Sequence, residues 1–276
     1  MTDTLPDVPA LLRARYGRAA PEITDPDILA SETLRLILNH HTVRTYSDRV
    51  VSDEHIAAIV AAAQSASSSS NNQSWSVVEV RDAGAKRRLV YEAGGSAFIA
   101  HAPVVLVFVA DWARATAIAG SHGAGSEAVG YLESTLVAFV DAGIAAQSAV
   151  LAAEALGLGT SYLGSLRNHP EAAADIVGLP QGAAVAFGVA LGWPADSAGI
   201  KPRLAPHVVH AREHYREVAL ADAEAYDEEL ARYNASQARA GTSWIAAVTA
   251  RVRDLRGLHG RETARAALER RGLPSR

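Results

Sequence analysis

The chain has 276 residues, of which 49% are hydrophobic and 20% are charged, a composition typical of globular proteins. Disordered and collagen-like chains are therefore excluded. The net charge of −4 excludes a general nucleic-acid-binding protein, and the absence of cysteine excludes disulfides, thiolate nucleophiles and cysteine-ligated metal sites.

The first ten residues, MTDTLPDVPA, lack the basic region and the apolar core of a signal peptide. The longest apolar run, residues 102–110, is much shorter than the roughly 20 residues that span a bilayer. We therefore expect a cytoplasmic protein without a membrane or nucleic-acid partner.

The beginning of the chain predicts three helices: residues 9–16, a segment ending near His40, and residues 53–66. Pro21, Asp25 and Pro26 predict a break after the first helix. Ser52 is a favourable N-cap for the third, because its hydroxyl can accept a bond from a free backbone N–H of the first turn.

Four strands are expected in the middle of the chain, at residues 77–80, 103–110, 159–164 and 183–191. The second is apolar throughout and β-branched, which is typical of a strand buried on both faces. Helices are expected at 83–92, 132–156, 170–177, 220–237, 243–254 and 260–271. Residues 132–156 are apolar on nearly all sides, which indicates a place in the interior or in an interface.

This order of elements predicts an α+β or α/β fold with a central sheet surrounded by helices, in one domain because no linker divides the chain. Several site motifs are absent. Gly157-x-Gly159 has no third glycine at dinucleotide-binding spacing, and neither a Walker sequence nor a G-x-S-x-G turn is present. The histidines His207, His210 and His214 have helical spacing, but a polar surface helix explains them and we expect no metal.

Four segments carry groups that suit an anionic, planar ligand. Residues 39–48 offer imidazole, hydroxyl and guanidinium groups, residues 65–75 are rich in serine, and residues 201–203 place proline between two cations. In residues 162–167, Gly164 lets a flat ligand approach the backbone closely. Each has a plainer alternative, namely a solvated loop or a flexible linker.

The basic C-terminal end is a further candidate. Residues 251–276 contain eight arginines and three acidic residues, a local charge of +5. A solvated helical tail and a site for a phosphate-bearing ligand are both compatible with it.

Together, in this order and spacing, the segments resemble the nitroreductase family of flavoproteins, and most closely its oxygen-insensitive, NADPH-preferring branch with the NADPH–FMN flavin reductases. The matching motifs are HHTVRTYSD, SSSSNNQSW, GGSAFIAHAP, EALGLGTSYLGSLRN, LGWPAD and KPR. The resemblance implies an N-terminal extension (1–29) and a nitroreductase-like FMN-binding domain (30–276). It also implies an α+β fold with a central mixed sheet flanked by helices, in a homodimer that holds FMN at its interface.

The resemblance further implies a set of cofactor-binding residues: His40, His41, Thr42, Arg44, Ser68, Ser70, Gln73, Ser96, Tyr162, Leu163, Gly164, Ser165, Lys201 and Arg203. Lys201 and Arg203 are expected at the FMN phosphate, with help from Thr42 and Ser68. Arg44 is expected at the pyrimidine edge of the flavin, where negative charge develops on reduction.

Backbone N–H groups of residues 163–165 are expected near flavin N5 and O4, with Tyr162 beside them. No catalytic residue is assigned with certainty; Ser70 and Arg256 are the candidates to face substrate. Two positions depart from the family pattern. His41 replaces a common arginine, which predicts a lower or pH-dependent phosphate affinity, and Ser96 replaces a common glutamine.

The implied function is that of an FMN-dependent NAD(P)H oxidoreductase, in which NADPH reduces the flavin and a nitroaromatic, a quinone or a similar small acceptor then takes the hydride in ping-pong fashion. One alternative is a flavin reductase that supplies free reduced FMN. An alternative of another class is a non-enzymatic FMN-binding module.

Overall fold

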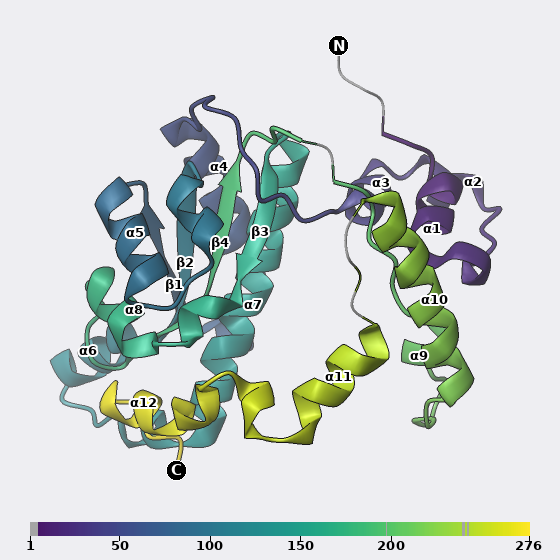
Figure 1. The fold of residues 1–276 in the computed structure, drawn as a ribbon. Coiled ribbons are helices and arrows are strands. Elements are labelled where there is room, and N and C mark those ends of the chain that lie inside the picture. The colour runs from purple at the N-terminus through teal and green to yellow at the C-terminus, as the bar shows by residue number, and fades with distance from the viewer. Residues whose placement is uncertain (1–4, 197, 239–240, 242) are drawn as a thin grey trace. The chain divides into compact units, whose positions relative to one another are not determined.

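The computed structural model describes residues 5–196, 198–238, 241 and 243–276. Its internal contacts divide the chain into two compact units. The helical unit comprises residues 1–41 and 198–258, and the sheet unit comprises residues 42–197 and 259–276 (Figure 1). The predicted boundary at residue 29 falls inside the helical unit, and the division into 1–29 and 30–276 stays a prediction.

The sheet unit is built on four strands: β1 (Trp75–Val80), β2 (Val104–Asp111), β3 (Gly159–Leu163) and β4 (Ala183–Gly192). Their order is β1-β2-β4-β3, and every neighbouring pair is antiparallel. A parallel bridge joins Thr42 to Thr160. The α+β class is confirmed, whereas the expected mixed sheet is wrong: the four described strands pair antiparallel, and Thr42 of the parallel bridge lies outside them.

Helices cover both faces of the sheet (Figure 1). Side chains of α4 (Asp53–Gln64) and α7 (Leu132–Ala155) form one core with β2 and β4, and side chains of α5 (Ala83–Tyr91) and α8 (Pro170–Ile176) form the other. Successive β2 residues from Val104 to Val109 alternate between the two cores and are at most 1% exposed. The prediction of a strand buried on both faces is therefore confirmed. The remaining helices are α6 (Ala113–Ser121), which the sequence did not predict, and α12 (Ala264–Arg270).

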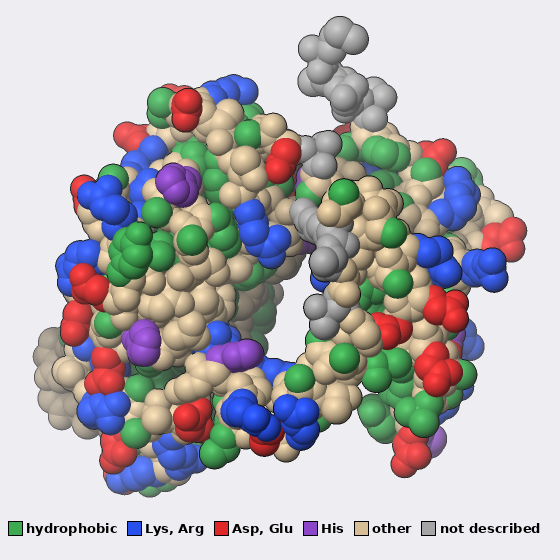
Figure 2. Space-filling view, in the orientation of Figure 1, with side chains coloured by type: hydrophobic (Ala, Val, Ile, Leu, Met, Phe, Trp, Pro, Cys, Tyr) green, Lys and Arg blue, Asp and Glu red, His purple; other side chains and the backbone are tan. Residues whose placement is uncertain are grey.

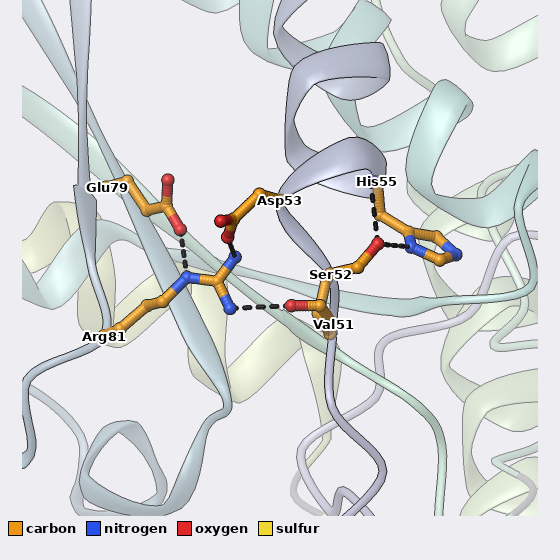
Figure 3. Close-up of polar contacts among 6 residues, drawn as sticks. All are labelled: Val51, Ser52, Asp53, His55, Glu79 and Arg81. Carbon is orange, nitrogen blue, oxygen red and sulfur yellow. Dashed lines mark hydrogen bonds and ion pairs between the residues drawn. The ribbon is translucent and has the colours of Figure 1, made fainter.

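The beginning of α4 is tied to the end of β1 (Figure 3). Ser52 accepts a hydrogen bond from the His55 backbone N–H at 3.3 Å, so the predicted N-cap is confirmed. The Ser52 hydroxyl also lies 2.6 Å from His55 Nδ1. The Arg81 guanidinium, which follows β1, donates to three oxygens beside this cap: the Val51 carbonyl at 2.6 Å, Asp53 Oδ1 at 3.1 Å and the Glu79 carboxylate.

The helical unit contains α1 (Val8–Tyr16), α2 (Pro26–Ala30), α3 (Glu32–Asn39), α9 (Pro206–Val209), α10 (Leu220–Ser236) and α11 (Trp244–Arg253). Tyr226 of α10 meets the Trp244 ring edge-on at 5.2 Å, which joins α10 to α11. Asp25 and Pro26 begin α2 instead of only breaking the chain: Asp25 is the N-cap and Pro26 occupies the first helical position, where its missing N–H costs nothing.

Helix α7 is the one described helix that is long and apolar enough to cross a membrane. Its composition has a structural reason here, because alanines such as Ala142, Ala146 and Ala149 are buried on this helix. Four other residues, the α7 stripe, recur every fourth position and are 41–58% exposed: Leu132, Leu136, Val140 and Ile144. The helix therefore has one buried side and one exposed apolar side.

Candidate functional site

In the helical unit, one guanidinium brings two predicted phosphate-binding segments together. Arg15 of α1 donates through Nη2 to the carbonyls of Leu38 and His40, at 2.8 and 2.7 Å. Its Nη1 donates to the Lys201 carbonyl at 2.7 Å. The end of α3 and the start of the Lys-Pro-Arg segment therefore lie side by side, although 161 positions separate His40 from Lys201.

The Lys-Pro-Arg segment is fixed through its backbone, and the Arg203 guanidinium also donates to the Lys201 and Pro202 carbonyls, at 3.3 and 3.1 Å. The Arg203 N–H donates to the Arg15 carbonyl at 2.9 Å. The Tyr226 hydroxyl, whose pKa is raised by burial, donates to the Pro202 carbonyl at 3.2 Å. Pro202 is buried while Lys201 and Arg203 are exposed. The structure thus places two exposed basic residues, Lys201 and Arg203, on a segment whose backbone is anchored. Charged donors in such an arrangement suit a phosphate ligand.

In the sheet unit, residues 42–44 are held against β3. The Val43 N–H donates to the Thr160 carbonyl at 2.9 Å. A Cβ on Gly159 would lie 2.5 Å from the Val43 side chain, so this approach requires glycine. Gly159, the second glycine of the Gly157-x-Gly159 sequence, therefore has a packing role. Arg44 is exposed, and its guanidinium carbon lies 5.9 Å from the centre of the Phe98 ring.

The serine-rich loop between α4 and β1 is organised by a buried carboxylate that the sequence analysis missed. Asp141 of α7 is 1% exposed. It accepts hydrogen bonds from the Ser69 N–H at 2.9 Å, the Ser74 hydroxyl at 2.8 Å and the Ser74 N–H at 3.4 Å. These bonds fix the middle and the end of the loop, which argues against a flexible linker.

Within the loop, three residues adopt left-handed backbone conformations that favour glycine: Ser70 (φ 48°), Asn71 (φ 55°) and Gln73 (φ 51°). Such conformations cost about 1–3 kcal/mol each and persist where the surroundings impose them, as functional sites often do. The Gln73 N–H donates to the Ser68 hydroxyl at 3.2 Å, inside the same turn. The strain therefore marks this loop as a candidate binding element.

Replacing Asp141 with alanine is expected to destabilise the chain by about 3 kcal/mol, because three donors lose a buried charged acceptor. Urea unfolding measures this change. Asp141→Asn keeps one acceptor oxygen and should lose less, and Glu133→Ala, at an exposed position of the same helix, should change little. Equal stability of the alanine variant and the wild type would contradict this role of Asp141.

The predicted flavin-edge residues lie at the end of β3. Tyr162 is 43% exposed, and its hydroxyl donates to Gln147 Oε1 at 3.2 Å. Partial burial, with the charge of Glu154, raises the pKa of Tyr162 to about 12, so the phenol is neutral near pH 7 and can donate a hydrogen bond. Leu163 is buried at 2% exposure, which leaves its backbone to face a ligand.

The turn after β3 has the properties of a cradle for a flat group. Among the described residues, the Ser165 and Ser161 hydroxyls are buried and have no hydrogen-bond partner. Both oxygens are enclosed by protein, so neither is open to a ligand in this structure. A Cβ on Gly164 would find no atom closer than Arg167 Nη2 at 3.7 Å, so the space beside this backbone is open. The open space beside the Gly164 backbone therefore leaves room for a flat group.

Two further predicted residues, Ser96 and Arg256, are exposed. Ser96 is exposed and precedes the turn formed by residues 97–101. Arg256 is exposed, and its guanidinium donates to both carboxylate oxygens of Asp254, at 3.1 and 2.6 Å. Figure 2 shows basic side chains gathered over the end of α11 and the turn after it. Arg253 pairs with the same carboxylate at 3.1 Å, so this basic cluster is partly neutralised.

The rest of the C-terminal end is also occupied by structural contacts. Arg270 pairs with Glu171 at 2.7 Å, and Arg271 donates to backbone carbonyls of residues 179, 180 and 183. These partners favour a structural role for the basic tail. The three histidines do not share a helix face, because α9 ends at Val209 and includes only His207.

Comparison with known proteins gives a consistent result. The model described as "Nitroreductase family" matches residues 37–193, and "Nitroreductase family, C-terminal domain" matches residues 201–276. An NADPH-flavin oxidoreductase of Vibrio harveyi is 36% identical over 207 residues, which cover 75% of this chain and 84% of the relative. An oxygen-insensitive NADPH nitroreductase of Salmonella typhimurium is 36% identical over 203 residues, with 74% and 82% covered.

Among solved structures, the NADPH:FMN oxidoreductase of Vibrio harveyi complexed with NAD+ is similar with a TM-score of 0.79 and 34% identity. The match covers 89% of this chain and all of that structure. The ranges matched by the two family descriptions do not include α1.

Proposed function

The chain belongs to the nitroreductase family, and we propose that it is an FMN-dependent NAD(P)H oxidoreductase of the nitroreductase type. NADPH is the electron donor, and nitroaromatics, quinones or similar small molecules are the acceptors. The observation that carries the proposal is the pair of exposed cations, Lys201 and Arg203, on a segment anchored beside His40. Bound FMN would supply the hydride-accepting and hydride-donating chemistry.

In this proposal the helical unit contributes phosphate recognition. Lys201 and Arg203 would donate charged hydrogen bonds to the phosphate. His40 and His41, at the end of α3, are the other proposed phosphate-binding residues of this unit. His41 Nδ1 lies 3.0 Å from the Asn39 carbonyl, so this imidazole is held on the backbone at the end of α3. Thr42 and Ser68 stay proposed phosphate contacts, as the resemblance to the family implies.

The sheet unit contributes the flavin contacts. Arg44 donates to the pyrimidine edge, where its permanent charge favours the electron-rich form. The N–H groups of residues 163–165 would donate to flavin N5 and O4, with the neutral phenol of Tyr162 beside them. Gln73 and Ser96 stay proposed ring contacts, and Ser70 and Arg256 stay the candidates to face substrate. No side-chain acid is required, because solvent can supply protons.

A homodimer is part of the proposal, with a second copy covering the α7 stripe. Its four apolar residues form a continuous exposed row on one helix. Contiguous exposed apolar surface of this kind marks an interaction surface. A cytoplasmic location also belongs to the proposal, since α7 is accounted for as a core helix. The proposed domain of residues 30–276 then forms the FMN-binding body, with residues 1–29 as an extension.

Replacing Leu136 and Val140 together with aspartate is expected to convert the dimer into monomers at micromolar concentration, because two charges would be buried in an apolar contact. Light scattering after size-exclusion chromatography measures the mass. Tyr91→Asp is the control, since Tyr91 is 81% exposed on α5, across the sheet from α7. A double variant that stays dimeric would contradict the proposed interface.

One relative is named as a flavin oxidoreductase, which favours a second candidate: a reductase that supplies free reduced FMN. Steady-state rates with free FMN and with nitrofurazone, measured on the same preparation, distinguish the two. A clear preference for free FMN supports the second candidate.

The cofactor itself provides the first experiment. We expect the protein to purify yellow and to release FMN, because the proposed grip fits one terminal phosphate and the chain has no dinucleotide-binding loop. Chromatography of the released flavin identifies it. Release of FAD, or a colourless protein that binds no added FMN, would contradict the proposal.

A further inference from the structure

Helix α1 lies outside both matched ranges, yet Arg15 on this helix is the group that joins the two proposed phosphate-binding segments. We propose that Arg15 is a positioning residue for the FMN phosphate: it sets Lys201 and Arg203 next to His40 without contacting the phosphate itself. This inference rests on the proposed function and assigns part of the binding site to the N-terminal extension.

Arg15 forms hydrogen bonds with the backbone of both basic residues, Lys201 and Arg203. The guanidinium donates to the Lys201 carbonyl, and the Arg15 main-chain carbonyl accepts from the Arg203 N–H at 2.9 Å. The same guanidinium donates to two carbonyls at the end of α3. Movement of this side chain would therefore shift the backbone of Lys201 relative to that of His40.

Arginine suits this position for two physical reasons. The last carbonyls of a helix lack intrahelical partners, and a planar guanidinium offers five donors in a fixed fork that can satisfy several of them at once. The side chain is only 5% exposed, so water does not compete for these carbonyls. A lysine would keep the charge but not the fork.

Helix α1 is itself held firmly. Asp7 caps its first turn by accepting from the Ala10 N–H at 2.7 Å, and Val8, Leu11 and Leu12 are 0–5% exposed. Burial of three aliphatic side chains fixes the helix against its neighbours. Arg15 is thus presented from a rigid element, which distinguishes it from a surface arginine that adapts to its surroundings.

The test compares two flavins that differ by the phosphate. Flavin-free wild type, Arg15→Met and Arg15→Lys are titrated with FMN and with riboflavin, and binding is followed by flavin fluorescence. Both variants are expected to weaken FMN binding about 10–100-fold, by analogy with the loss seen when residues that orient metal ligands are removed. Riboflavin binding should change less than about twofold, because riboflavin has no phosphate to misplace.

Arg271→Met is the matched control. Arg271 is also a buried arginine, at 8% exposure, and it also donates to three backbone carbonyls, but in the sheet unit. We expect it to lower the unfolding midpoint and to leave the ratio of FMN to riboflavin affinity unchanged. If Arg15→Met does not fold, Arg15→Lys retains most of the stem and carries the comparison.

The titrations test the positioning role of Arg15 separately from the proposed function. Equal weakening of FMN and riboflavin, or full FMN affinity in Arg15→Lys, would overturn the positioning role, since the first indicates a general loss of structure and the second a role of charge alone. Failure of the wild type to bind either flavin would instead overturn the proposed function.

Discussion

Lys201→Ala combined with Arg203→Ala is expected to release FMN from a protein that remains folded. Each charged hydrogen bond to a phosphate contributes about 1.5–3 kcal/mol, so the pair should weaken binding on the order of 10²–10⁴-fold. The backbone bonds that anchor this segment use the carbonyls of Lys201 and Pro202 and the N–H of Arg203. Alanine leaves these in place and removes only the bonds from the Arg203 guanidinium to the Lys201 and Pro202 carbonyls, so stability should fall by about 1 kcal/mol or less.

Exhaustive dialysis followed by the flavin absorbance per chain measures the retained FMN. The matched control is Arg87→Ala with Arg88→Ala, which removes two charges from exposed positions of α5. The control should keep its FMN. Stoichiometric FMN in the dialysed Lys201 and Arg203 variant would show that the phosphate is bound elsewhere.

Arg44→Ala is expected to slow flavin reduction by NADPH on the order of 10²–10³-fold, with a smaller effect on FMN binding. A donor aimed at a developing negative charge is worth about 2.7–4 kcal/mol in the transition state. Arg44 follows Val43, which is fixed to β3, and its guanidinium lies near Phe98. The charge is therefore held on an anchored segment, where it can act at one edge of the flavin.

Stopped-flow bleaching of the flavin under anaerobic conditions, at saturating FMN, measures the rate. Arg49→Ala is the control, because Arg49 is an exposed arginine on the same segment that stacks 3.3 Å from the centre of the Trp193 ring. An unaltered rate with weaker FMN binding would move Arg44 to the phosphate. No effect on either quantity would remove it from the site.

Much of the fold follows from local patterns in the sequence. The apolar run of β2 and the Ser52 cap were predicted because burial on two faces and helix capping each have a local signature. The pairing of the strands has none, since it joins β2 to β4 across about 80 residues. Helix α6 was missed because the glycine-rich stretch that begins at Gly120 indicates a loop, although alanine, the strongest helix former, supplies four of its nine residues.

The site divides in the same way. The ordered motifs pointed to its cations, its serine loop and its glycine turn. Arg15 gave no local signal, because its partners lie 23 to 186 positions away. Asp141 could have been found: an acid inside an otherwise apolar helix must have buried donors as partners, and the serine loop supplies them.

The visible spectrum of the purified protein before and after anaerobic addition of NADPH tests the central claim most directly. We expect an oxidised FMN spectrum that bleaches with one equivalent of NADPH and returns when nitrofurazone is added. A bound flavin that NADPH does not bleach would contradict the account and would identify a non-enzymatic FMN-binding module.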